Sequence, residues 1–298
     1  MSKDASDVEG LLLIDKPSGP TSHDVVDKVR WISGLRRVGH TGTLDPLASG
    51  LMFICVGRAT RLAEYLSDMP KSYHATIRLG QETDSFDSEG TLLRERPVSL
   101  SAEELNLALG TFRGDIVQKP PMFSAKKIKG KPLYKLARMG QEVSIPERSV
   151  TVYQLELTNW ELPYLELIIS CSAGTYIRSI AHDLGILLKC GGHITALRRI
   201  NIGDYSVDEA VSLSKLTPKN WQHYLRPTDT AVLHLPRLTF SEQDSLFLLN
   251  GRFVRRYSNH PQDPLARAYD SNGNFVGIVL LEDDLWRGKK IFYKSAVS

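Results

Sequence analysis

The sequence predicts an α+β fold, with a mixed β-sheet in a large first domain and a small β-rich second domain. Predicted strands and helices are interspersed over residues 1–228 without the regular βαβ alternation of a doubly wound sheet. After about residue 228 the pattern changes to short strands and turns, including an Asn272-Gly273 hairpin signal. The chain has 298 residues, 42% of them hydrophobic, which is enough for two cores. We therefore place the domains at 1–228 and 229–298.

Apolar periodicity and helix caps predict the elements of the first domain in order. Gly10–Ile14 predicts a buried strand, and Thr21 with Asp24 forms a capping-box pattern that opens a helix through about Ser33. Residues 34–50 are polar and rich in glycine, which predicts a loop. Further strands are expected at Leu51–Val56, Tyr73–Leu79, Tyr164–Cys171 and Ile194–Tyr205, and further helices at Thr60–Ser67, from the Ser101/Glu104 cap to Phe112, from Gly174 to Gly191, and after the Ser206/Glu209 cap.

The second domain is predicted from the same signals. Ser241 with Asp244 caps a short helix, and Gly251 closes it. Strands are expected at Leu265–Tyr269, Phe275–Leu281 and Lys290–Lys294.

Composition narrows the class of protein. The formal net charge is only +3, which permits nucleic-acid binding without requiring it. The three cysteines, Cys55, Cys171 and Cys190, form no C-x-x-C pair, so neither a disulfide framework nor a zinc site is expected. The N-terminus is acidic, and no apolar run approaches the about 20 residues that cross a bilayer. We expect a cytoplasmic protein without a membrane partner.

The segment Gly39–Gly50 is the most unusual stretch, because glycines and small residues surround one histidine and one carboxylate. An Asp-Pro in such a loop is most often a solvated turn. The glycine spacing matches neither the phosphate-binding G-x-x-x-x-G-K-[ST] pattern nor G-x-G-x-x-G. By itself, the loop predicts only that something binds here.

Six motifs in order resemble those of the TruB family of pseudouridine synthases. Gly39–Pro46, with the sequence GHTGTLDP, is similar to the catalytic motif of that family. The matches span about residues 10–205, and chance agreement at six collinear motifs is not plausible. The other five are Asp15–Ser22, Lys71–Tyr73, Pro120–Ala125, Gly174–Ser179, and Gly192-His193 with Leu197–Arg199.

The resemblance implies an enzyme that needs no cofactor or metal and isomerises uridine to pseudouridine at position 55 in the T loop of tRNA. It implies that Asp45 is the nucleophile, by attack on the sugar or by an elimination route, and that the Arg178 cation lowers its pKa. The base is expected to leave its stack and lie on Tyr73, while His40 fills the vacated space. Tyr176 and Leu197 are expected to line the pocket.

Seven basic residues and no acidic residue lie between Lys119 and Arg138, together with Met122, Phe123 and Tyr134. A charge run of this kind is usually a solvated face. Here the run resembles the thumb insertion of stand-alone TruB enzymes, which we place at about 119–145. The expected RNA contacts are Lys126, Lys127, Lys129 and, in the first motif, Lys16. The predicted partner is the T arm of tRNA. We expect no guide RNA and no obligatory protein partner, and we expect the enzyme to be a monomer.

The C-terminal domain resembles a PUA-type RNA-binding domain in position, size and strand pattern. Two basic clusters support that interpretation: Arg252, Arg255 and Arg256, and Arg287, Lys289 and Lys290. Three other readings stay open with less support. Asp84–Gly90 superficially resembles a calcium loop but fails its spacing, His182-Asp183 lacks a nucleophile motif, and an RNA-folding factor without catalysis would share the RNA-binding features.

Overall fold

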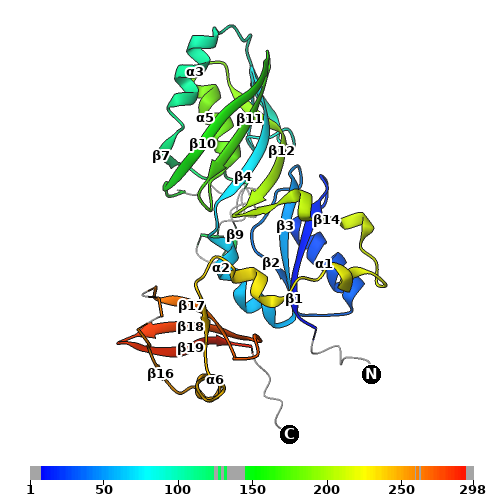
Figure 1. Ribbon diagram of the computed structural model, residues 1–298. Helices are drawn as coiled ribbons and strands as arrows, with labels where there is room; N and C mark the ends of the chain where they lie inside the picture. Colours follow the sequence, from blue (N-terminus) through cyan, green and yellow to red (C-terminus); the bar gives the residue numbers. More distant parts are fainter. Residues whose placement is uncertain are drawn as a thin grey trace.

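The structure is a computed structural model that describes residues 8–123, 127–128, 131–132, 145–258, 260–261 and 263–292; for 127–128 and 131–132 it describes the backbone alone. A long mixed sheet with its helices forms the larger part, and a separate five-stranded sheet forms the smaller part (Figure 1). The predicted α+β class with a β-rich C-terminal unit is confirmed.

The long sheet joins two halves of the first part. Its order is β14-β1-β3-β12-β4-β11-β10-β7, with β2 and β13 paired off this path. At the junction, β12 runs parallel to β3 and antiparallel to β4. The bounds are β1 Gly10–Lys16, β2 Val38–His40, β3 Ser49–Val56, β4 Lys71–Leu79, β7 Gly114–Gln118, β10 Arg148–Glu161, β11 Tyr164–Cys171, β12 Gly192–Ile202, β13 Tyr205–Ser206 and β14 Val211–Ser212.

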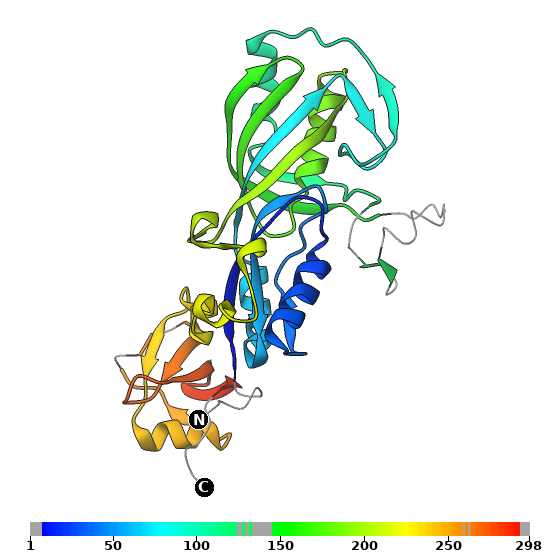
Figure 2. The ribbon, with the colours of Figure 1, turned by 90° about the vertical axis from the view of Figure 1, so that its right-hand side faces the viewer.

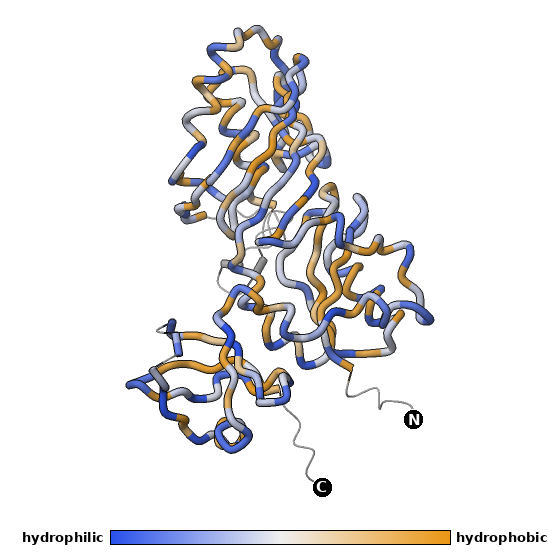
Figure 3. Tube along the Cα trace, viewed as in Figure 1, coloured by the Kyte–Doolittle hydropathy of each residue, from blue (hydrophilic) through white to orange (hydrophobic). Residues whose placement is uncertain are grey.

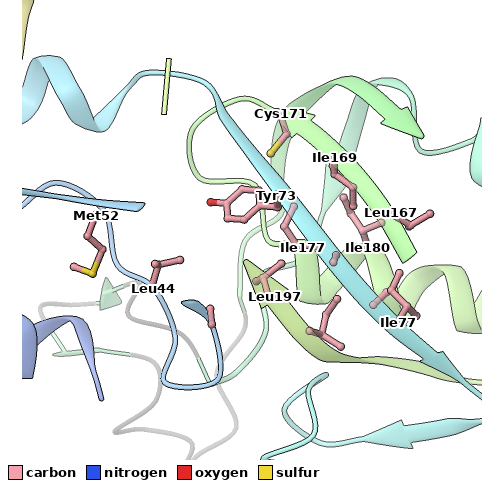
Figure 4. Close-up of a cluster of buried hydrophobic side chains, with 14 of the residues drawn as sticks. Leu44, Met52, Tyr73, Ile77, Leu167, Ile169, Cys171, Ile177, Ile180 and Leu197 are labelled. Carbon is pink, nitrogen blue, oxygen red and sulfur yellow. The ribbon is translucent and has the colours of Figure 1, made fainter. Parts of the chain in front are cut away.

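Helices α1 (Ser22–Ser33) and α5 (Ile177–Leu187) lie on the same side of this sheet (Figure 2) and share one apolar core with it. The predicted capping box of α1 is present, since the Thr21 side chain accepts from the Asp24 backbone and the Asp24 side chain accepts in return. The strict alternation on β4 points Tyr73 and Ile77 into this core beside Ile180 (Figure 4). Many of the hydrophobic residues lie on the strands of the sheets (Figure 3).

Helix α3 (Ala102–Gly110) has the predicted Ser101 capping box. The Thr60–Ser67 helix is split into a 3-10 segment, Gly57–Leu62, and α2, Ala63–Ser67. Short strands β5 (Gln81–Thr83) and β6 (Leu92–Glu95) form a two-stranded sheet beside β12.

Several sequence expectations differ from the structure. The expected loop at 34–50 contains β2, which pairs with β3. This strand was not predicted because three residues are too few to show an alternation of apolar and polar side chains. The Ser206 cap opens only one 3-10 turn, because the chain becomes extended at Ala210 and then pairs with β1 as β14. Helix α5 ends at Leu187, four residues before Gly191. Strands β7 and β10 were not predicted.

The C-terminal sheet has the order β15-β17-β18-β19-β16 and its own core around Trp286. The last strand is β19, Leu285–Ile291, earlier than the expected Lys290–Lys294, of which residues 293–294 lie outside the described chain. The remaining elements are β15 Arg237–Thr239, α6 Glu242–Leu249, β16 Val254–Arg255, β17 Leu265–Tyr269 and β18 Phe275–Glu282.

The two parts share a small apolar core. Ile278 and Phe292 pack in one cluster with Leu51 and Phe53 of the first part. Arg61 reinforces this contact by donating to the Ile291 carbonyl at 2.7 Å and by lying over the Phe292 ring. Within the part of the chain that the structure describes, no helix is long and apolar enough to cross a membrane.

Candidate active site

Asp45 lies in the loop between β2 and β3, and the surrounding chain holds this loop from two sides. On one side, the buried Ser22 hydroxyl accepts from Leu44 N at 2.8 Å and donates to Leu44 O at 2.9 Å. On the other side, the Lys16 ammonium donates to Pro46 O at 3.3 Å. A glycine-rich loop is flexible by itself, so these contacts are what fix Asp45.

Lys16 is fully buried, and its ammonium also donates to the carbonyls of Pro17 at 2.9 Å and Pro20 at 2.7 Å. Burial lowers its pKa to about 8, although the Asp45 carboxylate acts in the opposite direction. The sequence placed Lys16 among the RNA contacts. This geometry does not support a direct contact, because the ammonium points into the protein and joins the first motif to the Asp45 loop.

Arg178, at the start of α5, contacts Asp45 directly. Its Nε lies 3.0 Å from Asp45 Oδ2. The other two nitrogens face away from Asp45: Nη1 donates to Asp87 Oδ2 at 2.8 Å and to Ser85 O at 3.1 Å, and Nη2 donates to Phe123 O at 2.8 Å. Only 6% of the Arg178 side chain is exposed. A planar guanidinium bound on three sides has a single orientation.

Two opposing effects act on the pKa of the Asp45 carboxyl. Burial raises this pKa and is the larger effect, whereas the Arg178 guanidinium lowers it. The neighbouring Asp87 carboxylate adds to the rise. The net direction is upward, so the sequence-based expectation of a lowered pKa describes only the Arg178 contribution. One third of the Asp45 side chain, 35%, remains exposed and is open to a ligand.

Asp87 is a site residue that the motifs did not single out. It lies in the acidic turn that superficially resembled a calcium loop, and it is 2% exposed. Its Oδ1 accepts from the Ser85 hydroxyl at 2.6 Å and from Glu89 N at 3.1 Å, while Oδ2 binds Arg178. Among the residues that the structure describes, no three metal-ligating side chains cluster there or elsewhere.

A cavity of about 240 Å³ lies on one side of the Asp45–Arg178 pair, and we refer to it as the small cavity. The aromatic and apolar side chains in its lining include Tyr73, Tyr176 and Leu197, which the family motifs singled out. Figure 4 shows the Tyr73 ring near Ile177, with its oxygen directed away from Ile77, Leu167 and Ile169. Buried Gln118 holds Tyr176 by accepting from its backbone N at 3.1 Å and donating to its carbonyl at 3.2 Å.

Arg199 is a second buried cation of the small cavity, 2% exposed, that sequence reasoning treated only as part of a motif. Its Nε donates to Leu51 O at 2.7 Å and its Nη2 to Gly42 O at 3.2 Å. It lies opposite Tyr73 in the register of β12 and β4, and its charge opposes the rise that burial causes in the pKa of Tyr73. Arg199 thus ties β12 to β3 and to the Asp45 loop, where the sheet halves join.

A second cavity of about 700 Å³, the large cavity, lies on the other side of the pair and shares Asp45 and Arg178 with the small one. His40 lines it, and its Nδ1 accepts from Gly42 N at 3.3 Å. Burial lowers the pKa of His40, with smaller contributions in the same direction from Arg199 and His23. The other ionisable side chains in the lining, apart from Asp45 and Arg178, are His23, Asp84, Asp87 and Glu89.

The structure therefore brings together six residues that the motifs predicted for the site: Asp45, Arg178, Tyr73, His40, Tyr176 and Leu197. Of the predicted thumb contacts, Lys126 and Lys129 lie outside the described residues. Only the backbone of Lys127 is described, in the two-residue strand β8 (Lys127–Ile128), which pairs with β9 (Lys131–Pro132).

Two protein-family models match this chain. The model of the TruB family pseudouridylate synthase N-terminal domain matches residues 30–177. The model of the tRNA pseudouridylate synthase B C-terminal domain matches residues 178–233. Together they cover the Asp45 loop, both arginines of the site and the strands that carry Tyr73 and Leu197.

Curated relatives match almost the whole chain. The tRNA pseudouridine synthase B of Pseudomonas aeruginosa (strain UCBPP-PA14) is 42% identical over 284 residues, 93% of each protein. That of Clostridium kluyveri is 39% identical over 288 residues, 96% of this chain and 100% of the relative. A chain in a structure of an H/ACA RNP bound to a substrate RNA containing 2′-deoxyuridine superposes with a TM-score of 0.73 at 22% identity, covering 96% of this chain and 86% of that chain. That likeness concerns the fold.

Proposed function

The chain belongs to the TruB family of pseudouridine synthases, and from this premise we propose that it uses Asp45 to isomerise a uridine in tRNA. It is a tRNA pseudouridine synthase that acts on the uridine at position 55 in the T loop, as its relatives at about 40% identity indicate. The observation that supports the role of Asp45 is its position. Its carboxylate is ion-paired with Arg178 and stands between two cavities, and one of them is lined by Tyr73.

The reaction is a rearrangement that needs no electron donor or acceptor. The bond between N1 of the uracil and C1′ of the ribose breaks, the base turns, and C5 forms a new bond to C1′. The hydrogen at C5 leaves as a proton, and N1 gains a proton. Asp45 can form a covalent bond with the sugar or remove a sugar proton in an elimination; both routes need an ionised carboxylate, which Arg178 favours.

The small cavity suits a flipped pyrimidine. Tyr73 presents a ring on which a base can stack, and Leu197 and Tyr176 add further contact area. Because Tyr73 is paired with Arg199 in the register of β4 and β12, the sheet junction sets the position of its ring. On the opposite side, His40 lines the large cavity near the Asp45 loop, where we propose that it occupies the space left by the flipped base.

The rest of the tRNA is proposed to bind by its phosphates. The basic segment at about 119–145 carries Lys126, Lys127 and Lys129 and serves as the thumb that holds the T arm. Neutralising these three lysines is expected to weaken tRNA binding more at 50 mM salt than at 300 mM salt, because fewer counterions are released. Equal weakening at both concentrations, measured by filter binding, would contradict phosphate contacts.

We further propose a domain boundary near residue 228 and a PUA-like RNA-binding domain at 229–298. The structure narrows the basic residues that can serve it. Arg256, Arg287 and Lys290 are ion-paired with Asp284, Glu282 and Glu64. Arg252, Arg255 and Lys289 are exposed and are in none of these ion pairs, so the RNA-binding role rests mainly on them. The enzyme is proposed to act in the cytoplasm as a monomer, without a guide RNA or protein partner.

The decisive test uses purified chain and a tRNA transcript labelled with tritium at uracil C5. We expect the wild type to release tritium and Asp45→Asn to lose at least about 1,000-fold in rate, since a nucleophile is removed. Glu103→Gln, which changes an exposed carboxylate on α3 that lines neither cavity, is the matched control and should stay near the wild-type rate. Release by Asp45→Asn at the wild-type rate would remove the nucleophile assignment.

A second transcript tests the position. With cytidine in place of uridine 55 and the label on the remaining uridines, no release is expected. Continued release from this transcript would show that another uridine is the substrate, whatever the role of Asp45.

A further inference from the structure

We propose that the ring stack between Phe86 and His182 is a positioning device for catalysis. It holds the turn that carries Asp87 against α5, and it thereby sets the orientation of Arg178 beside Asp45. This inference rests on the proposed role of Asp45. Neither ring touches the cavity side of the Asp45 carboxylate, so both residues act through Arg178.

The stack is close and nearly parallel. The ring centroids of Phe86 and His182 lie 3.8 Å apart, with 14° between the ring planes. His182 follows Arg178 by four residues on α5, which places both side chains on one face of the helix, one turn apart. Helix α5 therefore contacts the turn at two adjacent points, once by the guanidinium and once by the ring.

The backbone of Phe86 explains why the turn needs such a contact. Its φ is +65°, in the left-handed region that non-glycine residues rarely adopt. Ser85 and Asp87, on either side of it, both present an acceptor to the same Arg178 nitrogen: Ser85 O at 3.1 Å and Asp87 Oδ2 at 2.8 Å. The left-handed residue between them turns the chain so that the two acceptors converge.

Glycine would adopt this conformation without steric cost, yet the position carries a large aromatic side chain. The ring of Phe86 is only half-buried, and it lies on His182 instead of in the apolar core. The backbone of the turn is already held by β12, because Phe86 O accepts from Ile194 N at 3.1 Å and Ser88 N donates to Ile194 O at 2.9 Å. The stack is thus the apolar counterpart of the Arg178–Asp87 ion pair.

The consequence is a defined geometry at the catalytic carboxylate. One nitrogen of Arg178 contacts Asp45. The other two donate to acceptors of the turn and to Phe123 O. If the turn moves away from α5, the guanidinium loses its fixed acceptors and its orientation toward Asp45 relaxes. Catalytic rates are sensitive to such displacements, since a shift of about 1 Å can cost about 100-fold.

The test compares variants that separate the ring from the backbone. Phe86→Gly removes the ring while it relieves the left-handed backbone, and His182→Ala removes the other half of the stack. Phe86→Tyr and His182→Phe keep two stacked rings. We expect Phe86→Gly and His182→Ala each to lower the single-turnover rate of tritium release by about tenfold, while Phe86→Tyr and His182→Phe remain within about twofold of the wild type.

Two further readouts distinguish positioning from stability. Single turnover with folded enzyme in saturating excess reports the rate per bound tRNA, so a partly unfolded preparation gives the same rate constant as long as the folded enzyme stays in excess. The tRNA dissociation constant is expected to stay within about twofold in all four variants, which separates a kcat effect from a KM effect. In the double variant, Phe86→Gly with His182→Ala, the rate loss should be smaller than the product of the single losses, because both remove one contact.

Lys189→Gly is the matched control. Lys189, just beyond α5, is exposed and has a φ of +59°, so glycine there relieves the same kind of backbone conformation without touching the rings. The rate of this variant is expected to equal that of the wild type. If Phe86→Gly or His182→Ala turns over within twofold of the wild type, or if His182→Phe is as slow as His182→Ala, the stack is not a positioning device. A wild type that releases no tritium would instead contradict the proposed function.

Discussion

The small and the large cavity share the Asp45–Arg178 pair, which we call the shared wall. They differ in the secondary structure elements that line them and in the charge of their lining residues. The small cavity is lined partly by side chains on β4 and β12, and its charged residues apart from that wall are the cations Lys71 and Arg199. The large cavity is lined mostly by loops and by the start of α1, and its other charged lining residues are the carboxylates Asp84, Asp87 and Glu89, beside His23 and His40.

The difference indicates a division of work within one site. A sheet junction holds rings at fixed positions, so the small cavity suits the reacting base, which must be placed against Asp45 within tenths of an ångström. Carboxylates repel phosphate, so the large cavity suits bases and hydroxyl groups of nucleotides next to the target. The phosphates of the RNA are then expected outside both cavities, on the basic segments.

The strongest test of this comparison is at the shared wall. Arg178→Lys keeps one positive charge but cannot reach Asp45, Asp87 and Phe123 O together, since an ammonium is a point charge without a planar fork. We expect a loss of at least about 100-fold in single-turnover rate. Arg198→Lys, next to Arg199 on β12 and paired with Asp15, is the control and should lose less than about twofold. Equal rate losses for the two variants would show that the contacts of the Arg178 guanidinium do not determine the single-turnover rate.

The small cavity alone is tested by Tyr73→Ala. Stacking of a base on an aromatic ring contributes about 1–3 kcal/mol, so the expected loss is about 5- to 150-fold in kcat/KM. The matched change on the other side is His40→Ala, for which we expect a smaller loss, because the role that we propose for His40 is only to fill the space left by the base. If His40→Ala is the more damaging of the two in tritium release, the assignment of the base to the small cavity is reversed.

The rigidity of the small cavity is tested by stability. Arg199→Met leaves Leu51 O and Gly42 O without their donor, and we expect the free energy of unfolding to fall by about 2–4 kcal/mol. The neighbouring Arg198→Met removes an ion pair whose arginine is 39% exposed, and about 0–1 kcal/mol is expected. Urea denaturation followed by tryptophan fluorescence measures both. Similar losses would show that burial at the junction does not decide stability.

The two cavities should respond to pH at opposite ends of the range. Burial lowers the pKa of Lys71 to about 8, so between pH 8 and 10.5 the folded chain binds fewer protons than the unfolded chain, and stability rises with pH there. Lys71→Met should flatten that rise.

The pKa of His40 is lowered from 6.5, so the contribution of His40 to stability is present above pH 6.5 and is lost as the pH falls through the lowered value. His40→Gln should reduce that acid loss.

The measurement for this pair is the unfolding free energy of wild type and variant from pH 5 to 10. Only the difference between the two curves is used, since Lys16, with a pKa of about 8, also titrates at the alkaline end. A Lys71→Met curve parallel to that of the wild type above pH 8 would show that this lysine is not buried as a cation in solution.

Most of the fold could be predicted because local patterns determine it. The Thr21/Asp24 and Ser101/Glu104 caps mark the starts of α1 and α3, and the alternation at 73–79 marks β4. The Ser206/Glu209 cap was equally good as a local signal, yet only one 3-10 turn forms, because pairing of β14 with β1 competes with the helix. Strand pairing is decided at a distance, and no local pattern reports it.

The sequence by itself determined the candidate chemistry. The family motifs predicted that Asp45, Arg178 and Tyr73 form one site, and the three line the same cavity in the structure. It also determined the α+β class, since apolar periodicity follows from the geometry of helices and strands.

Only the tertiary structure decided how that chemistry is supported. Asp87 in an acidic turn and Arg199 in a strand carry no local mark of their role, because their partners are about 90 and 150 residues away in the chain. Lys16 appeared to be an RNA contact and is fully buried. Burial and direction of a side chain depend on which segments meet at the junction of β3, β12 and β4, and that meeting exists only in the folded chain.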